Sequence, residues 1–150
     1  MPYFKTIQYK FDVTDSNDEA IRKAILVPLA AYNESHTGPN EYRALAVILR
    51  DEADTVVGGI CGATCYGWFS IQLLVVPENL RGRGIGKELM LQAEREALSR
   101  GCHSAWLDTY EFQARGFYEK LGYVRFGELQ NYPTGFSRFF LQKTLSPIEK

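Results

Sequence analysis

The chain has 150 residues, of which 45% are hydrophobic and 23% are charged, and its formal net charge is −1. This length and composition fit a single globular domain, spanning residues 1–150, with a core large enough to fold without disulfides or metals. The near-neutral charge argues against nucleic-acid binding, which depends on many phosphate contacts.

No apolar run approaches the 18 residues of a membrane-spanning helix, so no membrane association is expected. The N-terminal segment lacks the apolar region of a secretory signal. Three cysteines, Cys61, Cys65 and Cys102, form no CxxC pair. Reduced thiols in a cytoplasmic protein are therefore expected, and no metal site.

The first half of the chain predicts one helix and four strands. Alternating β-forming residues predict a strand over 3–11. The segment from Ser16 to Glu19 has capping-box spacing, and the helix that follows should run to about Tyr32. Pro28 should kink or split this helix. Further strands are predicted over 44–49, 55–66 and 69–76, the last two joined by a turn at Gly67.

The second half opens with the clearest helix of the sequence, over residues 84–99. Its apolar positions Ile85, Leu89, Ala93 and Ala97 fall on one face. A strand over 104–109, a short helix over 114–121 and strands over 123–129 and 137–145 follow. The middle strands should be antiparallel because tight turns join them, whereas the crossover helix makes its two flanking strands parallel. This order predicts a mixed α/β sheet.

A glycine-rich segment, "ENLRGRGIGKEL" at 78–89, lies between a strand and the clearest helix. Amides at a helix N-terminus are unpaired and carry a partial positive charge, so such a site binds phosphates. Glycines let a ligand approach the main chain, and cationic side chains add charge that a diphosphate can use. The segment supplies both, as Gly82, Gly84 and Gly86 with Arg81, Arg83 and Lys87.

Two common phosphate motifs do not fit this segment. A Walker A loop needs a glycine where Arg81 stands and a serine or threonine where Glu88 stands. The dinucleotide fingerprint GxGxxG requires a third glycine at Lys87 or at Leu89, depending on where it starts. It also belongs to a run of parallel strands, which the antiparallel strands before it do not provide.

Two signatures resemble those of the GNAT superfamily of N-acetyltransferases. "RGRGIG", residues 81–86, matches its [QR]-x-x-G-x-[GA] motif, and "GFYEKLGY", residues 116–123, resembles its second signature. They are separated by a helix and a strand, as in the family. The predicted element order agrees over nearly the whole chain, which is similar to small bacterial members.

The resemblance implies a single acetyltransferase domain with acetyl-CoA as co-substrate. It implies a mixed sheet with antiparallel N-terminal strands, a central parallel pair splayed around the cofactor and helices on both faces. Main-chain groups of Leu74 and Val76 would pair with the pantetheine arm. The pyrophosphate would be held by the amides of 83–87, within the set Arg81, Gly82, Arg83, Gly84, Gly86 and Lys87.

The chemistry implied is direct attack by a primary amine. A lysine-like amine has a reference pKa near 10.4, so only about one molecule in 10³ is neutral at pH 7 and a proton must be removed. A main-chain amide near Leu74 would stabilise the developing oxyanion. Tyr118 matches the tyrosine that protonates the departing thiolate in this family. The alternative for Tyr118 is a packing role.

The general base is less well defined, because the strand that often carries a glutamate in this family reads "SIQLLVV". Gln72 cannot act as a base but could orient a water molecule. Asp108, at the end of the next strand, is the best remaining carboxylate, and its alternative is a structural role. Glu111 and His36 are weaker candidates.

The acceptor is expected to be a primary amine of a small molecule or peptide. Tyr32 and Asn33 are expected to face it, and aromatic walls are expected from Tyr110, Trp68, Tyr132 and Phe136. The C-terminal hairpin is alternatively a surface for a second subunit, as in a homodimer. A second function class also stays open: a non-catalytic sensor or scaffold that binds CoA or acyl-CoA without turnover.

Overall fold

The computed structural model describes residues 8–147. The chain divides into two compact units, Met1–Pro39 and Asn40–Lys150, which are described separately. In the described residues, no helix is long and apolar enough to cross a membrane.

Among the described residues of the first unit, 8–39, there is one helix, α1 (Glu19–Thr37). Its N-cap is Asp18, whose carboxylate accepts a hydrogen bond from the Ile21 amide at 2.9 Å. Pro28 lies inside α1 without ending it, because the missing amide removes only one bond of the ladder. The helix extends five residues beyond the predicted end and stops at Gly38, whose φ of 76° and ψ of −170° suit glycine and cannot continue a helix.

The predicted N-terminal strand is wrong where it can be checked. Residues 8–11 form no strand, and residues 3–7 lie outside the described part of the chain. The side chains of Tyr9 and Phe11 are 74% and 94% exposed. Alternation alone does not make a strand, since a strand needs a neighbour to satisfy its backbone groups, and residues 8–11 pair with none of the described strands.

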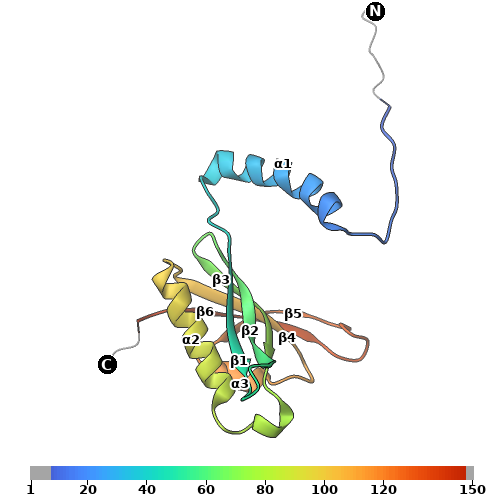
Figure 1. Cartoon of the computed structure of the whole chain (residues 1–150). Coiled ribbons are helices and arrows are strands. Elements are labelled where there is room, and N and C mark those ends of the chain that lie inside the picture. Colours follow the sequence, from blue (N-terminus) through green and yellow to red (C-terminus); the bar gives the residue numbers. More distant parts are fainter. Residues whose placement is uncertain (1–7, 148–150) are drawn as a thin grey trace, which may run out of the picture. The chain divides into compact units, whose positions relative to one another are not determined.

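The second unit is built on one six-stranded sheet with the order β1-β2-β3-β4-β6-β5 (Figure 1). The neighbours β3 and β4 run parallel, and the other neighbouring pairs are antiparallel. The predicted mixed sheet with antiparallel N-terminal strands and a central parallel pair is confirmed. The strands are β1 (Arg43–Arg50), β2 (Val56–Cys65), β3 (Trp68–Val75), β4 (Ser104–Tyr110), β5 (Val124–Leu129) and β6 (Arg138–Thr144).

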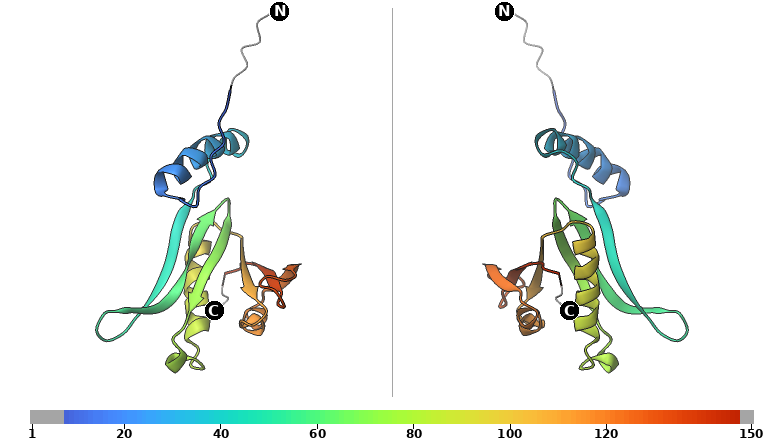
Figure 2. Two further views of the ribbon diagram at one scale, coloured as in Figure 1. Left: turned by 90° about the vertical axis from the view of Figure 1, so that its right-hand side faces the viewer. Right: turned by 90° about the vertical axis from the view of Figure 1, so that its left-hand side faces the viewer.

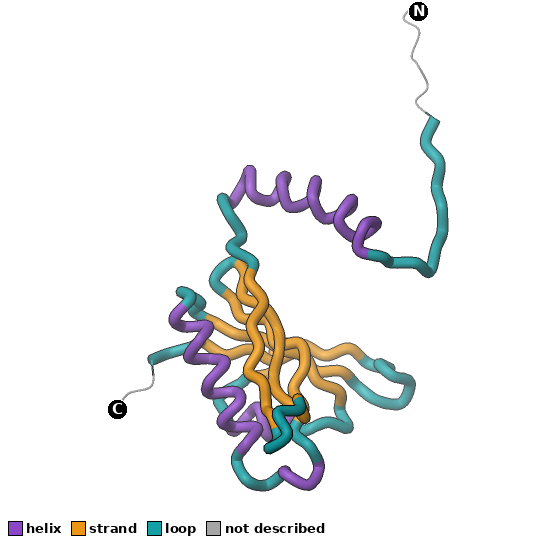
Figure 3. The backbone as a smooth tube through the Cα atoms, viewed as in Figure 1, coloured by secondary structure: helices purple, strands orange, loops and turns teal. Residues whose placement is uncertain are grey.

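Helix α2 (Ile85–Ser99) packs against β1, β2 and β3 (Figures 1 and 3). Its buried apolar positions Leu89, Met90, Ala93 and Ala97 meet the sheet, which confirms the predicted face. The short α3 (Arg115–Lys120) follows β4, and a 3-10 turn, η1 (Glu78–Leu80), precedes the glycine-rich segment. Helices on both faces stay a prediction, because α1 belongs to the other unit.

A buried polar network links α2 to β6 and to the start of β5. The Tyr123 hydroxyl donates to Glu94 Oε1 at 2.8 Å, and Lys143 Nζ lies 3.0 Å from Glu94 Oε2 and 3.1 Å from Oε1. Tyr123 is 2% exposed and Glu94 6%. Both carboxylate oxygens are therefore satisfied, as a buried charge requires.

One irregularity of the sheet decides where a ligand can enter. Along β3, Ile71 pairs with Gly62 of β2 and Leu73 pairs with Cys61, so Gln72 is an extra residue with no opposite partner on β2. Such a bulge bends a strand. The ladder between β3 and β4 stops at the same point, at Ile71 and Leu107. Beyond it the two parallel strands part, and the twist of the sheet is visible in Figure 2.

Candidate active site

A cleft of about 1120 Å³ opens where β3 and β4 part. Its walls are the end of β3, the glycine-rich segment with the start of α2, the end of β4, and α3. It brings together most of the predicted site residues: Gln72, Leu74, Val76, Arg81, Gly82, Gly84, Gly86, Lys87, Asp108 and Tyr118. Arg83 does not line it. Segments far apart in the sequence thus converge on one space.

The glycine-rich segment presents bare backbone to this cleft. Gly82 and Gly84 have φ values of 79° and 78°, which L side chains rarely adopt, and a Cβ at either would meet no atom within 4 Å. The first helical bond runs from the Glu88 amide to the Gly84 carbonyl at 3.0 Å. Within residues 8–147, the amides of 85–87 have no backbone acceptor. This end of the cleft suits an anion.

Two residues of the same segment have structural duties as well. Arg81 Nε donates to the Val76 carbonyl at 3.2 Å, which ties the segment to the end of β3. A Cβ on Gly86 would lie 3.2 Å from the Phe117 ring and 3.6 Å from Val76 Cγ2. Gly86 therefore allows close packing of α2 against α3, in addition to lining the cleft.

Tyr118 lies on α3 and is half-buried beside the cleft. Its ring meets Phe117 and Tyr123 edge-on, with centroids 5.1 and 6.2 Å apart. Burial raises the pKa of Tyr118, and the negative charge of Asp108 raises it further. Among the described residues, every fully buried side-chain oxygen has a hydrogen-bond partner. The Tyr118 hydroxyl has no such partner there, so it is not fully buried and reaches accessible space.

Asp108, at the end of β4, is held by Arg138 of β6. The guanidinium contacts Asp108 Oδ1 through Nη2, and its Nε donates to the same oxygen at 2.7 Å. The two side chains remain 27% and 22% exposed. Within the described residues, Oδ2 has no protein partner. Asp108, which lines the cleft, thus combines a fixed orientation with one oxygen that has no partner among the described residues.

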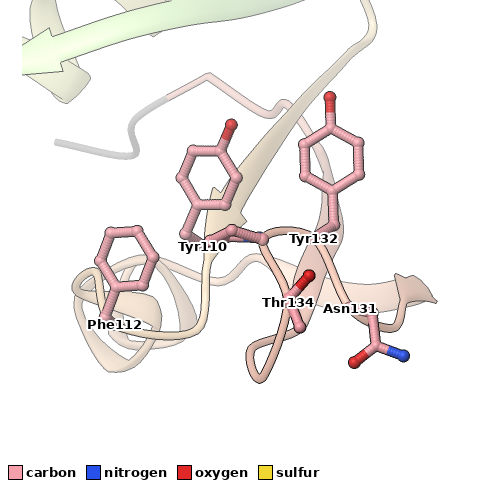
Figure 4. Close-up of a pocket in the computed structure, with 6 residues that line it drawn as sticks. Tyr110, Phe112, Asn131, Tyr132 and Thr134 are labelled. Atoms are coloured by element: carbon pink, nitrogen blue, oxygen red, sulfur yellow. The ribbon is translucent and has the colours of Figure 1, made fainter.

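Next to the cleft lies a smaller pocket of about 470 Å³, which we call the aromatic pocket (Figure 4). It is lined by Tyr110, Phe112, Asn131, Tyr132, Pro133 and Thr134. Phe112 borders the cleft as well. Two of the predicted aromatic walls, Tyr110 and Tyr132, thus line the same pocket. The ring of a third, Phe136, packs against Phe112 with ring centroids 5.2 Å apart. Trp68 instead lies at the paired start of β3 against His103, with ring centroids 5.6 Å apart.

Two other acceptor candidates belong to the first unit, and Glu111 belongs to the second. Tyr32 and Asn33 are on α1, in the first unit, where the Tyr32 ring packs on His36 with centroids 4.7 Å apart. The Glu111 carboxylate accepts from the Ser137 amide at 2.7 Å, which gives it a structural use in the loop.

Sequence reasoning missed Arg138 and Phe112. The signal for Arg138 was a lone cation at the start of the apolar strand "RFFL", next in the sheet to the strand with Asp108. Phe112 stands in the loop "YEFQ", whose path the sequence does not define.

A cleft between parting strands that ends at bare helix amides is shaped for an extended donor with a phosphate group at one end. Comparison with known proteins gives the class. The sequence profile of the acetyltransferase (GNAT) family matches residues 9–123. Acetyltransferase Atu2258 of Agrobacterium fabrum is 40% identical over 133 residues, which are 89% of this chain and 97% of that protein.

Two further relatives agree. A blasticidin-S acetyltransferase of Streptomyces morookaense is 35% identical over 95 residues, or 63% of this chain and 70% of that protein. A crystal structure described as an acetyltransferase from Agrobacterium tumefaciens has a TM-score of 0.85 at 39% identity, covering 91% of this chain and 99% of that one. The chain belongs to the GNAT family of acetyltransferases.

The family uses acetyl-CoA as co-substrate. The residues at the cleft fit such a donor, because Gly82 and Gly84 leave open the space that side chains would fill. The unpaired amides of 85–87 and the cations Arg81 and Lys87 complement a pyrophosphate at the same end.

Proposed function

We propose that this enzyme transfers the acetyl group of acetyl-CoA to a primary amine of a small molecule or peptide, by direct attack of the amine. One observation carries the proposal: β3 and β4 part at Gln72, and the resulting cleft leads to the bare amides of α2. Membership of the GNAT family supports turnover over the alternative of a non-catalytic sensor.

The donor would lie along the cleft with its pyrophosphate at the start of α2. Acetyl-CoA, when bound, supplies a thioester that an amine can attack. The amides of the 83–87 segment would hold the pyrophosphate, assisted by Arg81 and Lys87. Among the described strands, none pairs with β3 beyond Ile71 on its β4 side, so main-chain groups near Leu74 and Val76 are available to the pantetheine arm. The Val76 carbonyl already accepts from Arg81, which leaves its amide for the ligand.

Tyr118 would protonate the departing thiolate. Its raised pKa keeps the hydroxyl protonated at neutral pH, so it can donate a proton. Tyr118 lines the cleft, and its hydroxyl is accessible to solvent. Packing against Phe117 and Tyr123 holds the ring in place.

Amine deprotonation would run through Asp108 and a water molecule that Gln72 also orients. Both residues line the cleft, one at the end of each parting strand. Arg138 occupies Oδ1 of Asp108 and fixes the carboxylate, while Oδ2 remains available to that water. This arrangement favours a relay over direct proton transfer from the amine to the carboxylate.

We place the reaction in the cytoplasm, supported by the three cysteines, which are all free thiols. Small-molecule acceptors are preferred over peptides, because a relative is a blasticidin-S acetyltransferase. Tyr32, Asn33 and Tyr110 are proposed to contact the acceptor, and a homodimer formed through the C-terminal hairpin remains part of the proposal.

A matched pair of glycine variants tests the donor site. Gly84→Val and Gly101→Val strain the two ends of α2 alike, because φ is 78° and 88° and neither Cβ meets an atom within 4 Å. Calorimetry should show CoA affinity at least tenfold weaker for Gly84→Val, about 1.4 kcal/mol. Gly101→Val should bind like wild type. Equal affinities in folded proteins would refute the site.

Turnover distinguishes an enzyme from a sensor. Thiol release from acetyl-CoA should require an added amine, with blasticidin S and simple alkylamines in the first panel. Binding of CoA without release of thiol for any amine would favour the sensor.

A further inference from the structure

The aromatic pocket has a lining that selects by shape and by π-surface. None of its six lining residues carries a charge: they are three aromatic residues, a proline and two small polar residues. A pocket for a polycationic chain would instead present carboxylates. Asn131 and Thr134 offer neutral hydrogen-bonding groups at its edge (Figure 4).

The rings of this pocket form a continuous platform. Tyr110 and Phe112 stack with centroids 5.3 Å apart and planes 5° apart, and Tyr110 and Tyr132 lie 5.9 Å apart at 27°. In Figure 4 the two tyrosines stand side by side with their hydroxyls pointing the same way. Phe112 and Tyr132 remain 59% and 45% exposed. Exposed aromatic surface of this kind is available for a planar group to stack on.

The platform is fixed in place before any ligand arrives. The Arg138 guanidinium lies over the Tyr110 and Tyr132 rings at 5.2 and 4.7 Å, and Asp108 holds that guanidinium. A hydrogen bond closes the loop that contains Tyr132: the Tyr132 amide donates to the Phe136 carbonyl at 2.9 Å. The Glu111 amide donates to the Ser137 carbonyl at 2.8 Å, which ties this loop to the one with Phe112. Preorganisation of this kind lowers the cost of binding.

The platform also continues into the cleft. Phe112 borders both spaces, and Tyr110 follows Asp108 by two residues on β4. A molecule whose ring lies on the platform can therefore place an attached amine beside Asp108.

We infer that the aromatic pocket binds a planar aromatic or heteroaromatic ring of the acceptor, so that the preferred substrates are amines carrying such a ring on a short linker. The inference rests on the proposed function and names the substrate class for the same site. Stacking on Tyr110, Phe112 and Tyr132 provides the selection, and the guanidinium that already lies over Tyr110 and Tyr132 disfavours a cationic ring beside it.

A pair of amines with equal linkers tests this inference at saturating acetyl-CoA. Pyridylethylamine has a flat ring, whereas cyclohexylethylamine has a saturated and more hydrophobic ring of the same size. Stacking predicts kcat/KM at least tenfold higher for the pyridyl compound. Simple hydrophobic burial predicts the reverse order, and that result would overturn the inference.

Variants of Tyr132 locate the effect. Tyr132→Leu should reduce the preference to less than threefold, and Tyr132→Phe, which keeps the ring, should retain it. Phe126→Leu is the control, since Phe126 is 53% exposed on β5, contacts Phe140 and does not line the pocket. An unchanged preference in Tyr132→Leu would overturn the inference.

Two further measurements distinguish a failure of this inference from a failure of the proposed function. Saturation-transfer NMR should show contact with the pyridyl ring in wild type and its loss in Tyr132→Leu, even if turnover is slow; no contact in wild type overturns the inference. Sedimentation of both proteins reports assembly, and a dimer that Tyr132→Leu converts to monomer would make this surface a subunit interface. If the wild-type protein does not bind CoA, the proposed function is refuted instead.

Discussion

Strand β6 carries two cations that pair with two carboxylates, and the pairs differ in how completely each acid is bonded. Glu94, 6% exposed, has both oxygens occupied by Lys143 and one also by Tyr123. Asp108, at the cleft, uses one oxygen for Arg138, and its other oxygen has no partner in the described part of the chain. A fully bonded buried acid serves the fold, whereas a half-bonded acid at a cavity retains capacity for substrate or water.

Tyr118 stands between these two pairs. Its ring packs on Tyr123, a member of the buried network, and the charge of Asp108 acts on its hydroxyl. Variants at the three places should therefore separate stability from turnover.

The largest effect is expected from Glu94→Ala. Removing this carboxylate leaves the Lys143 ammonium and the Tyr123 hydroxyl without their partner, so the free energy of unfolding should fall by about 3 kcal/mol. Urea unfolding followed by circular dichroism measures it. Glu128→Ala, which removes an exposed partner 3.9 Å from Arg125, should change it by less than about 1 kcal/mol. Similar small losses in both variants would contradict the structural role of the buried network.

The next effect is on turnover. Tyr118→Phe removes a hydroxyl that has no protein partner in the described chain, so stability should be nearly unchanged. Loss of the proton donor should lower kcat by about 100-fold, measured by thiol release. Tyr42→Phe, at a 61% exposed position, is the matched control. Single-turnover rates should be compared as well, because slow product release can hide a chemical defect; equal rates would assign Tyr118 to packing.

A smaller effect is expected at the half-bonded acid. Asp108→Asn keeps the shape of the side chain but removes its charge, so kcat at pH 7 should fall about tenfold. Raising the pH should restore part of it, because more of the amine is then neutral at the start. The pH dependence of kcat is the measurement. A profile that matches wild type would show that Asp108 only orients Arg138.

The smallest effect concerns alkaline stability. Burial raises the pKa of Tyr123, and the charge of Glu94 and the hydrogen bond to it raise it further. The unfolded chain therefore loses this proton near pH 10 while the folded protein keeps it, so the stabilisation is complete below pH 10 and declines above it. At pH 10.5 the decline from Tyr123 should be about 0.8 kcal/mol. Unfolding curves of Tyr123→Phe should lack this part of the decline above pH 10.

Most of the second unit follows from local sequence signals. Helix α2 was predictable from its apolar face, and the parallel β3–β4 pair from the crossover that α2 makes. The glycine-rich segment was found because its residue types are adjacent in sequence. Asp108 with Arg138 and Glu94 with Lys143 could not be paired in advance, since they lie 30 and 49 residues apart and their meeting depends on strand order.

The N-terminal errors have a different cause. The predicted strand over 3–11 was based on alternation, which does not report whether a neighbouring strand exists. Fading apolar periodicity predicts the end of α1 near Tyr32, but the helix continues to Thr37 and stops at Gly38, whose φ of 76° and ψ of −170° lie outside the helical region. Helix ends are set by backbone conformation as much as by amphipathic pattern.

The bulge at Gln72 has a consequence for how the cleft is inherited. Its opening depends on one surplus residue in β3 and not on the chemistry of that residue's side chain. Substitutions at position 72 should therefore leave the passage open, even where they remove the side chain that we propose to orient the water molecule. A deletion of that residue would shift the pleat of the strand beyond it by one place and turn those side chains to the opposite face. The opening therefore depends on the number of residues in β3. Among relatives, an insertion or deletion at this position would show whether the opening is kept, whereas the identity of the residue would not.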